Sequence, residues 1–396
     1  MAGEKIALGF GGNVDYEIEW NSAVFEDLVV QHRIREDEIS TGVEVRDMRS
    51  LLLSILGYMR AGSGAEVFAR DNTIIEEFSK LFKYQVTIGG TGARAAISMA
   101  KLGYSARLHV LGDNEHLRRL LPREGTKIWG TEGDSLYPHL VIQYVKGTEI
   151  NTPALHLTAE AANRIIYVNN PQKLAPQINY AFFDNLEGIE AMLISGFNSI
   201  HDRDIMTAFT EKLSQALAGL PPQIRVYWED ACYHVQEFTA IAQKALCPYV
   251  EIVGLNEDEF GRYMGIKIDL LDPAQVWSLL PKLKEIIPVP VIVVHTKYWA
   301  LAYGKDAEKY RSCLKGGINL ATTRFRYGDE MNLERYRETS ALGKDPQGTE
   351  FCGTIQALGG NGICCEPSLD AKETRVTTIG LGDAFVGGFI PAMTSR

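Results

Sequence analysis

The feature that most constrains the fold is a series of short apolar, β-branched runs that each end in glycine or a polar residue. They occupy residues 5–9, 107–112, 191–196, 225–229, 250–254 and 289–295. Continuous apolar runs are typical of strands buried on both faces, as in parallel sheets. Between them lie segments with helical spacing of apolar residues, such as 202–217. This alternation predicts an α/β fold with a doubly wound, mainly parallel sheet, whose ligands bind at the carboxyl ends of the strands.

Two stretches interrupt the alternation, at residues 16–83 and 125–187. The first contains long helical patterns, and the second contains runs that alternate as strands with one buried face do. An insertion that forms a second α+β domain explains both. The expected domains are a large α/β domain from residues 1–15, 84–124 and 188–396, and a small lid domain from residues 125–187 and part of 16–83. The polar, glycine-rich segment 327–370 predicts loops.

Charge, the pattern of apolar residues and cysteine spacing disfavour several classes of function. The 396 residues carry a formal net charge of −10, which disfavours binding to nucleic acid or to an anionic membrane. We find no run of eighteen apolar residues and no amino-terminal basic segment followed by an apolar stretch, so we expect a cytoplasmic protein. The six cysteines lack zinc-binding spacing, so reduced structural thiols are expected rather than a metal site.

The sharpest motif lies near the carboxyl end, at Gly380-Leu381-Gly382-Asp383. Two glycines allow a tight turn in which successive backbone N–H groups converge on an oxyanion at the start of an apolar helix. Asp383 in the first helical turn is then positioned to take a proton from a substrate hydroxyl beside a phosphoryl group. The simpler alternative is that the aspartate only caps the helix.

A second motif, Asn256-x-x-Glu259, follows a predicted buried strand. A carboxylate at that position can hold a hydrated Mg²⁺ ion that bridges phosphate oxygens. The alternative is the solvated acidic start of a helix.

These two motifs, in this order, resemble those of the ribokinase-like sugar kinases, and other segments narrow the resemblance to the ADP-dependent glucokinase and phosphofructokinase family. The supporting segments are residues 11–15, 89–92, 163–166, 194–197 and 294–296. The resemblance extends over nearly the whole chain. It implies a ribokinase-like sheet with a smaller inserted lid domain.

The resemblance also implies roles for individual residues. Asp383 would be the catalytic base, and Gly380, Leu381 and Gly382 would frame the anion hole. Glu259 would organise Mg²⁺ through water, with Asn256 beside it. Glu229 matches a carboxylate of the family's H-x-E element, which assists the metal, but Tyr227 stands where the family has histidine. That departure leaves the second metal contact open.

On the nucleotide side, the resemblance assigns Arg164 to a phosphate and places His295 and Thr296 near the nucleotide edge. A guanidinium suits this role because it pairs bidentately with phosphate and stays charged. Simpler alternatives are a surface arginine, a core histidine at a strand end and, for Glu229, a helix cap.

The sugar pocket would be formed by short polar side chains on glycine-rich turns, since each buried hydroxyl must be paired. The residues that the resemblance assigns to it are Asn13, Asp15, Glu66, Gly89 and Gly90. Glu66 is similar to the glutamate that contacts hexose in family members acting on glucose. Arg94 could attract a sugar phosphate, or it could be an exposed helix residue, which we favour. Glucose is therefore the preferred acceptor, with fructose 6-phosphate next.

The sequence thus predicts a Mg²⁺-dependent kinase that transfers the β-phosphoryl group of ADP to a hexose or hexose phosphate and releases AMP. The alternatives are an ATP-dependent relative and a non-catalytic sugar-binding protein. A nicotinamide dehydrogenase is disfavoured, because no G-x-G-x-x-G follows the first strand. We expect no nucleic-acid or membrane partner, and a monomer or small homo-oligomer.

Overall fold

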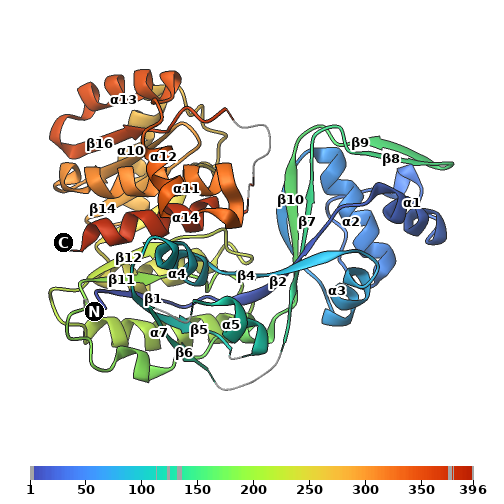
Figure 1. Cartoon of the computed structure of the whole chain (residues 1–396), viewed down its shortest axis with the longest axis horizontal. Helices are drawn as coiled ribbons and strands as arrows, with labels where there is room; N and C mark the ends of the chain where they lie inside the picture. Colours follow the sequence, from blue (N-terminus) through green and yellow to red (C-terminus); the bar gives the residue numbers. More distant parts are fainter. Residues whose placement is uncertain are drawn as a thin grey trace.

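The computed structural model describes residues 4–112, 114–122, 125–131, 136–372, 377 and 379–394. These residues form a nine-stranded sheet, a five-stranded sheet and a two-stranded hairpin. The two larger sheets belong to separate bodies, on the left and right of Figure 1, and strands β2 and β4 extend from one body into the other. None of the helices in these ranges is both long and apolar enough to cross a membrane.

The larger sheet has the order β16-β15-β14-β13-β12-β11-β1-β5-β6. The strands from β14 to β6 are parallel, and β15 and β16 are antiparallel additions at one edge. Their bounds are β1 Ile6–Leu8, β5 Ala106–Val110, β6 Thr126–Gly130, β11 Ala191–Ile194, β12 Arg225–Glu229, β13 Ile252–Asn256, β14 Val291–His295, β15 Trp299–Gly304 and β16 Ile363–Pro367. The prediction of a mainly parallel sheet is confirmed, and every predicted core run forms a strand of it.

Helices cover both faces of this sheet, as a doubly wound fold requires. The core on one face includes residues of α7 (Arg203–Ala218), α8 (Phe238–Leu246), α9 (Glu257–Met264), α10 (Pro273–Ile286) and α13 (Pro346–Gly359). The core on the other face includes residues of α4 (Thr91–Lys101), α5 (Glu115–Leu120), α11 (Arg311–Tyr327) and α14 (Leu381–Phe389). The continuous apolar runs are explained, because each central strand is buried on both sides.

Segment 327–370 differs from the prediction of loops. It contains α12 (Leu333–Ser340), α13 and the edge strand β16. Helix α13 begins where Asp345 accepts a hydrogen bond from the Gly348 N–H at 2.7 Å, so the polar residues act as caps around a helix with a buried apolar face. The remaining short helices are α6 Pro171–Leu174, η1 Glu36–Glu38, η2 Tyr180–Phe183, η3 Cys247–Tyr249, η4 Ala307–Tyr310, η5 Gly328–Glu330, η6 Gly360–Gly362 and η7 Ile390–Met393.

The smaller sheet has the order β3-β10-β7-β2-β4 and its own apolar core. Its strands are β2 Asn13–Ile18, β3 Ala65–Phe68, β4 Tyr84–Gly89, β7 His139–Tyr144 and β10 Asn163–Val168, and the hairpin strands are β8 Glu149–Thr152 and β9 Leu155–Thr158. That core includes residues of α1 (Ser22–Gln31), α2 (Met48–Ala61) and α3 (Asn72–Ser79), and Figure 1 shows these helices beside the smaller sheet.

Three strands lie, wholly or in part, in a different sheet from the one that the predicted domain boundaries imply. The first residues of β2, 13–15, were expected in the large domain, yet they pair with β4 and β7 in the smaller sheet. Strand β4 was expected in the large domain, yet it pairs with β2 in the smaller sheet. Strand β6 was expected in the insertion, yet it pairs with β5 at the edge of the larger sheet. The physical reason is that pairing partners, rather than local sequence, decide which sheet a strand joins.

Helix α14 lies against α11 through glycines at close range. A Cβ atom on Gly388 would lie 2.1 Å from the Gly316 carbonyl oxygen, and one on Gly317 would lie 2.6 Å from the Phe385 ring. Only residues without side chains allow the two helices to approach so closely. This contact matters for the site because the first turn of α14 carries the Gly380–Asp383 motif.

We predict that Gly388→Ala lowers the free energy of unfolding by about 1–3 kcal/mol, because the added methyl group meets backbone that must move. The matched control is Gly353→Ala in α13, where nothing lies within 4 Å of the added methyl group. That change should stabilise the helix by up to about 1 kcal/mol. Urea unfolding of both variants measures the difference, and equal stability would contradict the close packing of α11 and α14.

Candidate active site

The Gly380–Asp383 turn begins α14 in the predicted manner. Gly380 is the residue before the helix and has a left-handed backbone, with φ of 69°. A Cβ atom there would lie 3.0 Å from Arg324 Nε and 3.1 Å from Arg94 Cδ. Both the positive φ and the lack of space therefore require glycine. Thr378, which precedes the motif, lies outside the described residues.

Arg324 is a site residue that the sequence analysis missed. It is buried in α11, its Nε donates to the Ile379 carbonyl oxygen at 2.7 Å, and its Nη1 lies 2.9 Å from Asp329 Oδ1. The chain therefore places a second guanidinium beside the glycine turn. In the sequence this arginine resembles an ordinary basic residue near the end of a helix, so no local signal distinguishes it.

Asp383 lies in the first turn of α14, and its side chain keeps 22% of its exposure. Its Oδ2 lies 3.8 Å from Arg94 Nε. The Asp383 carboxylate is partly open to solvent, so a ligand can reach it. The buried cation that it faces, Arg94, neutralises its charge only in part. That position fits either a general base or a helix cap, and the residue at the N-cap, Gly380, has no side chain with which to cap the helix.

Arg94 is not the exposed helix residue that we favoured. Its side chain is 10% exposed, and Nη2 lies 3.0 Å from Asp15 Oδ2 and 3.2 Å from Glu17 Oε1. Burial opposes its charge, but Asp15, Asp383 and Glu17 together hold the pKa of the guanidinium above its usual value. The correction follows from pairing across the fold, because these carboxylates belong to β2 and α14 rather than to the helix of Arg94.

Asn13 and Asp15 lie on β2 at the centre of this cluster. Burial raises the pKa of Asp15 to about 6, and the charge of Arg94 limits the rise. Asn13 Nδ2 hydrogen-bonds Asp15 and lies 3.1 Å from His139 Nδ1. Two buried atoms, Asn13 Oδ1 and His139 Nε2, have no hydrogen-bond partner among the described residues. Buried polar atoms without a partner keep hydrogen-bonding capacity that water or a ligand with hydroxyl groups can satisfy.

Gly89 and Gly90 pack directly against these side chains. A Cβ atom on Gly89 would lie 2.3 Å from Asn13 Nδ2 and 2.5 Å from Asp15 Oδ2. Gly90 has φ of 89° and precedes α4, the helix that carries Arg94. The paired glycines thus let β2 and α4 approach each other, which brings Asp15 and Arg94 together.

Glu66 lies on β3 and reaches toward the larger sheet. Its Oε1 lies 3.2 Å from His234 Nε2 and accepts from Ser199 Oγ at 3.4 Å. Burial opposes ionisation, but the adjacent His234 imidazole and the positive charge of Lys173 hold the pKa of Glu66 below its usual value. Lys173 is itself buried and was not identified from the sequence. Glu66 is therefore an ionised acceptor whose side chain is 29% exposed.

Glu229 ends β12 and is bound on both oxygens. His295 Nε2 lies 2.8 Å from Oε1, and the Tyr227 hydroxyl donates to Oε2 at 2.9 Å. Burial opposes the charge on His295, but Glu229 raises its pKa above the usual value. A Cβ atom on Gly254 would lie 1.8 Å from the Tyr227 hydroxyl, so glycine makes room for the tyrosine. Glu229 thus anchors His295 and Tyr227.

Asn256 and Glu259 form a capping box at the start of α9. The Asn256 side chain accepts from the Glu259 N–H at 3.0 Å, and Glu259 Oε2 accepts from the Asn256 N–H at 2.8 Å. The ordinary helix-start role is therefore present. Burial, together with Asp230 and Glu229, raises the pKa of Glu259 well above its usual value.

The side chains near Glu259 and Glu229 fit a Mg²⁺ ion only if water and phosphate supply part of its ligands. Across the described part of the chain, no three His, Cys, Asp or Glu residues are arranged to hold a metal. Glu229 already accepts two hydrogen bonds, whereas Glu259 has one oxygen without a hydrogen bond in the capping box. A nearby cation would relieve the repulsion that raises the pKa of Glu259. Mg²⁺ typically keeps several waters and few protein ligands.

His295 connects the two motifs. Its ring stacks on Phe385 of α14 with centroids 4.5 Å apart, and Cε1 lies 3.5 Å from the position of a Cβ atom on Gly382. The Gly380–Asp383 turn and the end of β14 are therefore neighbours. The predicted motifs, which are far apart along the chain, thus lie beside each other at the carboxyl ends of β12, β13 and β14.

The remaining predicted residues border this site less closely. The Thr296 hydroxyl donates to the Trp299 carbonyl oxygen at 2.9 Å and so fixes the turn between β14 and β15. Leu381 begins α14 and is half-buried. Arg164 lies on β10, two residues from Ile166, which pairs with Glu66. Since alternate residues of a strand share a face, Arg164 lies on the same face as Glu66.

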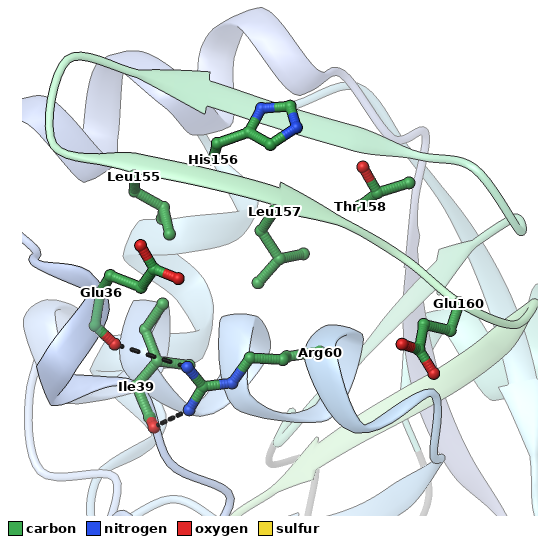
Figure 2. Close-up of a pocket in the computed structure, with 8 residues that line it drawn as sticks. All are labelled: Glu36, Ile39, Arg60, Leu155, His156, Leu157, Thr158 and Glu160. Atoms are coloured by element: carbon green, nitrogen blue, oxygen red, sulfur yellow. Dashed lines mark hydrogen bonds between the residues drawn. The ribbon is translucent and has the colours of Figure 1, made fainter.

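Figure 2 shows a different hollow, in the smaller body, where β9 passes α2 and η1. It has a volume of about 140 Å³ and is lined by Glu36, Ile39, Arg60, Leu155, His156, Leu157, Thr158 and Glu160. Arg60 donates to the Glu36 carbonyl oxygen at 3.5 Å. None of the predicted site residues lines this hollow.

Comparison with known proteins identifies a family over nearly the whole chain. The family model of the ADP-specific phosphofructokinase/glucokinase conserved region matches residues 4–388. No curated protein sequence matches the chain.

Several solved structures have a similar fold. A phosphofructokinase from Pyrococcus horikoshii OT3 with AMP is 15% identical, with 99% of each chain covered and a TM-score of 0.78. The last common ancestor of ADP-dependent phosphofructokinases from Methanosarcinales is 16% identical, with 99% of this chain and 94% of that chain covered and a TM-score of 0.73. An ADP-dependent kinase in complex with fructose-6-phosphate and ADPβS is 14% identical, with 98% and 93% covered and a TM-score of 0.75. At these identities the likeness shows the fold.

We predict that Arg94→Leu destabilises the fold by about 3–5 kcal/mol at pH 8, because it leaves Asp15 and Glu17 buried without their cation. The loss should shrink as pH falls to 5. Without Arg94 the folded-state pKa of Asp15 rises above its present value of about 6, so the folded variant takes up a proton that the unfolded chain binds only near pH 4.

Urea unfolding at pH 8 and pH 5 measures both effects, with wild-type protein as the reference at each pH. A loss that grows at pH 5 would contradict the assignment of Asp15 as the main unpaired group.

Proposed function

The chain belongs to the ADP-specific phosphofructokinase/glucokinase family, and from that premise we propose that it transfers the β-phosphoryl group of ADP to glucose, giving glucose 6-phosphate and AMP. The family assignment makes the protein an ADP-dependent sugar kinase, a phosphotransferase with a hydroxyl acceptor. The observation that carries the proposal is the position of Asp383 at the start of α14, 3.8 Å from the buried Arg94.

In the proposed reaction, Asp383 accepts the proton of the attacking sugar hydroxyl as that oxygen forms a bond to the β-phosphorus. The bond between this phosphorus and the bridging oxygen breaks, and AMP leaves. Negative charge spreads over the equatorial oxygens of the phosphoryl group during transfer. The N–H groups at the start of α14 and the buried guanidinium of Arg94 stabilise that charge. Arg164 contacts a nucleotide phosphate from the smaller body.

Mg²⁺ would be held through water by Glu259, beside Asn256, and would supply charge neutralisation at the nucleotide phosphates. Glu229 contributes by holding His295 under the glycine turn through the hydrogen bonds that its oxygens accept, and each of these oxygens keeps a second lone pair. With Glu229 so engaged, Tyr227 takes part as a donor to that carboxylate.

The sugar-side charges favour an unphosphorylated hexose. The carboxylates Asp15, Glu17 and Glu66 exceed the nearby cations Arg94 and Lys173, and Arg94 already pairs with two of them. Burial lowers the pKa of His139 to about 3, so this imidazole is neutral at pH 7. Ionised carboxylates, a neutral imidazole and unpaired amide oxygen bind hydroxyl groups well and repel a phosphate dianion.

Fructose 6-phosphate is the second candidate, and Lys173 is the observation in its favour. The lysine is buried, and its charge acts on Asp15, Glu66 and His139. An ammonium group in that position would attract a phosphate. We rank glucose first because the adjacent Glu66 and Asp15 carboxylates already balance that charge.

We also propose that the smaller body is a lid over the sugar. Support comes from Glu66 on β3, which meets Ser199 and His234 on segments that follow β11 and β12 of the larger sheet. Closing these groups over the acceptor would exclude water and limit hydrolysis of ADP.

We expect Asp383→Asn to lower kcat by at least roughly 10²-fold while the affinity for sugar changes little, as loss of a general base should. Asparagine keeps the size of the side chain, so the fold should persist. Steady-state rates with ADP, together with calorimetric titration of the sugar, separate the two effects. A near-wild-type kcat would remove Asp383 from the role of base.

A panel of ADP, ATP and pyrophosphate against glucose and fructose 6-phosphate should give AMP and glucose 6-phosphate as the preferred products. Product mass identifies donor and acceptor together. Higher kcat/KM with fructose 6-phosphate would replace glucose as the acceptor and assign Lys173 to the phosphate. Turnover with ATP but not ADP would overturn the proposed donor, and sugar binding without transfer would indicate a non-catalytic relative.

A further inference from the structure

Two histidines outside the predicted site connect the larger sheet to Glu66. His201 lies in the segment after β11, and His234 lies in the segment after β12. Their rings are close, with His201 Nε2 and His234 Nδ1 2.9 Å apart. His234 Nε2 then lies 3.2 Å from Glu66 Oε1. The three side chains form a continuous polar chain between the two bodies.

The 2.9 Å contact permits two arrangements of the protons, and the Glu66 carboxylate beside His234 Nε2 favours the one in which that nitrogen carries a hydrogen. Of the two ring nitrogens that face each other, one must donate and the other accept. When His201 Nε2 carries the hydrogen, His234 Nδ1 is the acceptor. A neutral His234 then carries its hydrogen on Nε2, the nitrogen that faces Glu66. The ring of His201 is itself held by Phe68 of β3, with centroids 4.9 Å apart.

His234 Nε2 lacks a hydrogen bond of normal geometry among the described residues, although it is buried. Its side chain is 11% exposed, and its 3.2 Å contact with Glu66 Oε1 is an ion-pair distance that is not among the hydrogen bonds of the structure. Leaving a buried donor unpaired costs about 1–3 kcal/mol. An additional acceptor is therefore expected at this place when the protein is loaded with its ligand.

A sugar hydroxyl is the group that matches this pair. It can accept from the His234 N–H and donate to the Glu66 carboxylate at the same time, because a hydroxyl has one hydrogen and two lone pairs. The charges nearby are consistent with a neutral hydroxyl. The titratable groups that face the pair are His201, His139 and Lys173, and the lysine charge supports the ionised form of Glu66.

We propose that His234 binds the acceptor sugar directly, clamping one hydroxyl together with Glu66, and that His201 is a positioning residue that sets the tautomer and orientation of His234. The inference rests on the proposed function, because it takes the sugar as the ligand at Glu66. It adds to the sugar pocket a residue from the larger body, opposite the lid.

The test compares His234→Leu, which removes the donor, with His234→Gln, whose amide N–H can reach the position of Nε2. The matched control is His156→Leu, an exposed histidine on β9 (Figure 2). Calorimetric titration with D-glucose measures binding without relying on turnover, and steady-state kinetics with ADP measures KM and kcat. Thermal unfolding of each variant verifies the fold.

His234→Leu should weaken glucose binding at least ~10-fold, which corresponds to about 1.4 kcal/mol. The KM for ADP should remain as in wild type, since the clamp contacts only the sugar. His234→Gln should restore most of the affinity, and His156→Leu should behave as wild type. His201→Leu should weaken binding less than His234→Leu does, because it only frees the ring of His234.

Deoxyglucoses that each lack one hydroxyl then identify the clamped group. One of these deoxyglucoses should bind to wild type and to His234→Leu with equal affinity, because it lacks the hydroxyl group that the histidine contacts. Equal glucose affinity of wild type and His234→Leu overturns the inference, and if turnover with glucose persists the proposed function stands. Failure of glucose to bind wild type overturns both. Loss of affinity that glutamine does not restore, with no matching deoxyglucose, overturns the direct contact.

Discussion

The site depends above all on one buried guanidinium. Arg94 of α4 lies within 3.2 Å of carboxylates on β2 and 3.8 Å from Asp383 of α14. It therefore connects three elements: β2, which passes into the smaller body, α4, which follows the paired glycines, and α14, which carries the candidate base Asp383. A buried cation with several carboxylate partners costs much to disrupt, because each partner would be left charged without compensation. The same charge also faces the position where a phosphoryl group would pass.

Glycines make this arrangement possible by permitting close approach rather than by adding flexibility. Gly89 leaves space for Asn13 and Asp15, Gly254 leaves space for Tyr227, and Gly388 lets α14 lie on α11. In each case a single methyl group would displace a polar side chain or a backbone carbonyl. Tyrosine at the position of the family's histidine fits the same pattern, because its hydroxyl and His295 together bind Glu229.

The sugar side of the site is organised by acceptors and neutral donors. Asp15 and Glu66 carry the carboxylates, His139 is neutral because of burial, and Asn13, His139 and His234 keep buried atoms that lack partners. Such a set is costly when empty and is satisfied by a molecule with several hydroxyl groups. Glu66 belongs to the smaller sheet and His234 to the larger body, so a molecule held by both residues would connect the two bodies.

The sequence by itself determined the features that depend on neighbours along the chain. Continuous apolar runs predicted the parallel strands, and the spacing of glycine and aspartate at residues 380–383 predicted a turn that begins a helix, because backbone preference and burial pattern act over a few residues. Only the tertiary structure decided which sheet receives β4 and β6, that Arg94 is buried rather than exposed, and that Arg324 flanks the glycine turn. It also brought His201 to His234 and His234 to Glu66. These features join segments far apart in the chain, and pairing of charges and hydrogen bonds across such distances is set by packing, which leaves no local pattern.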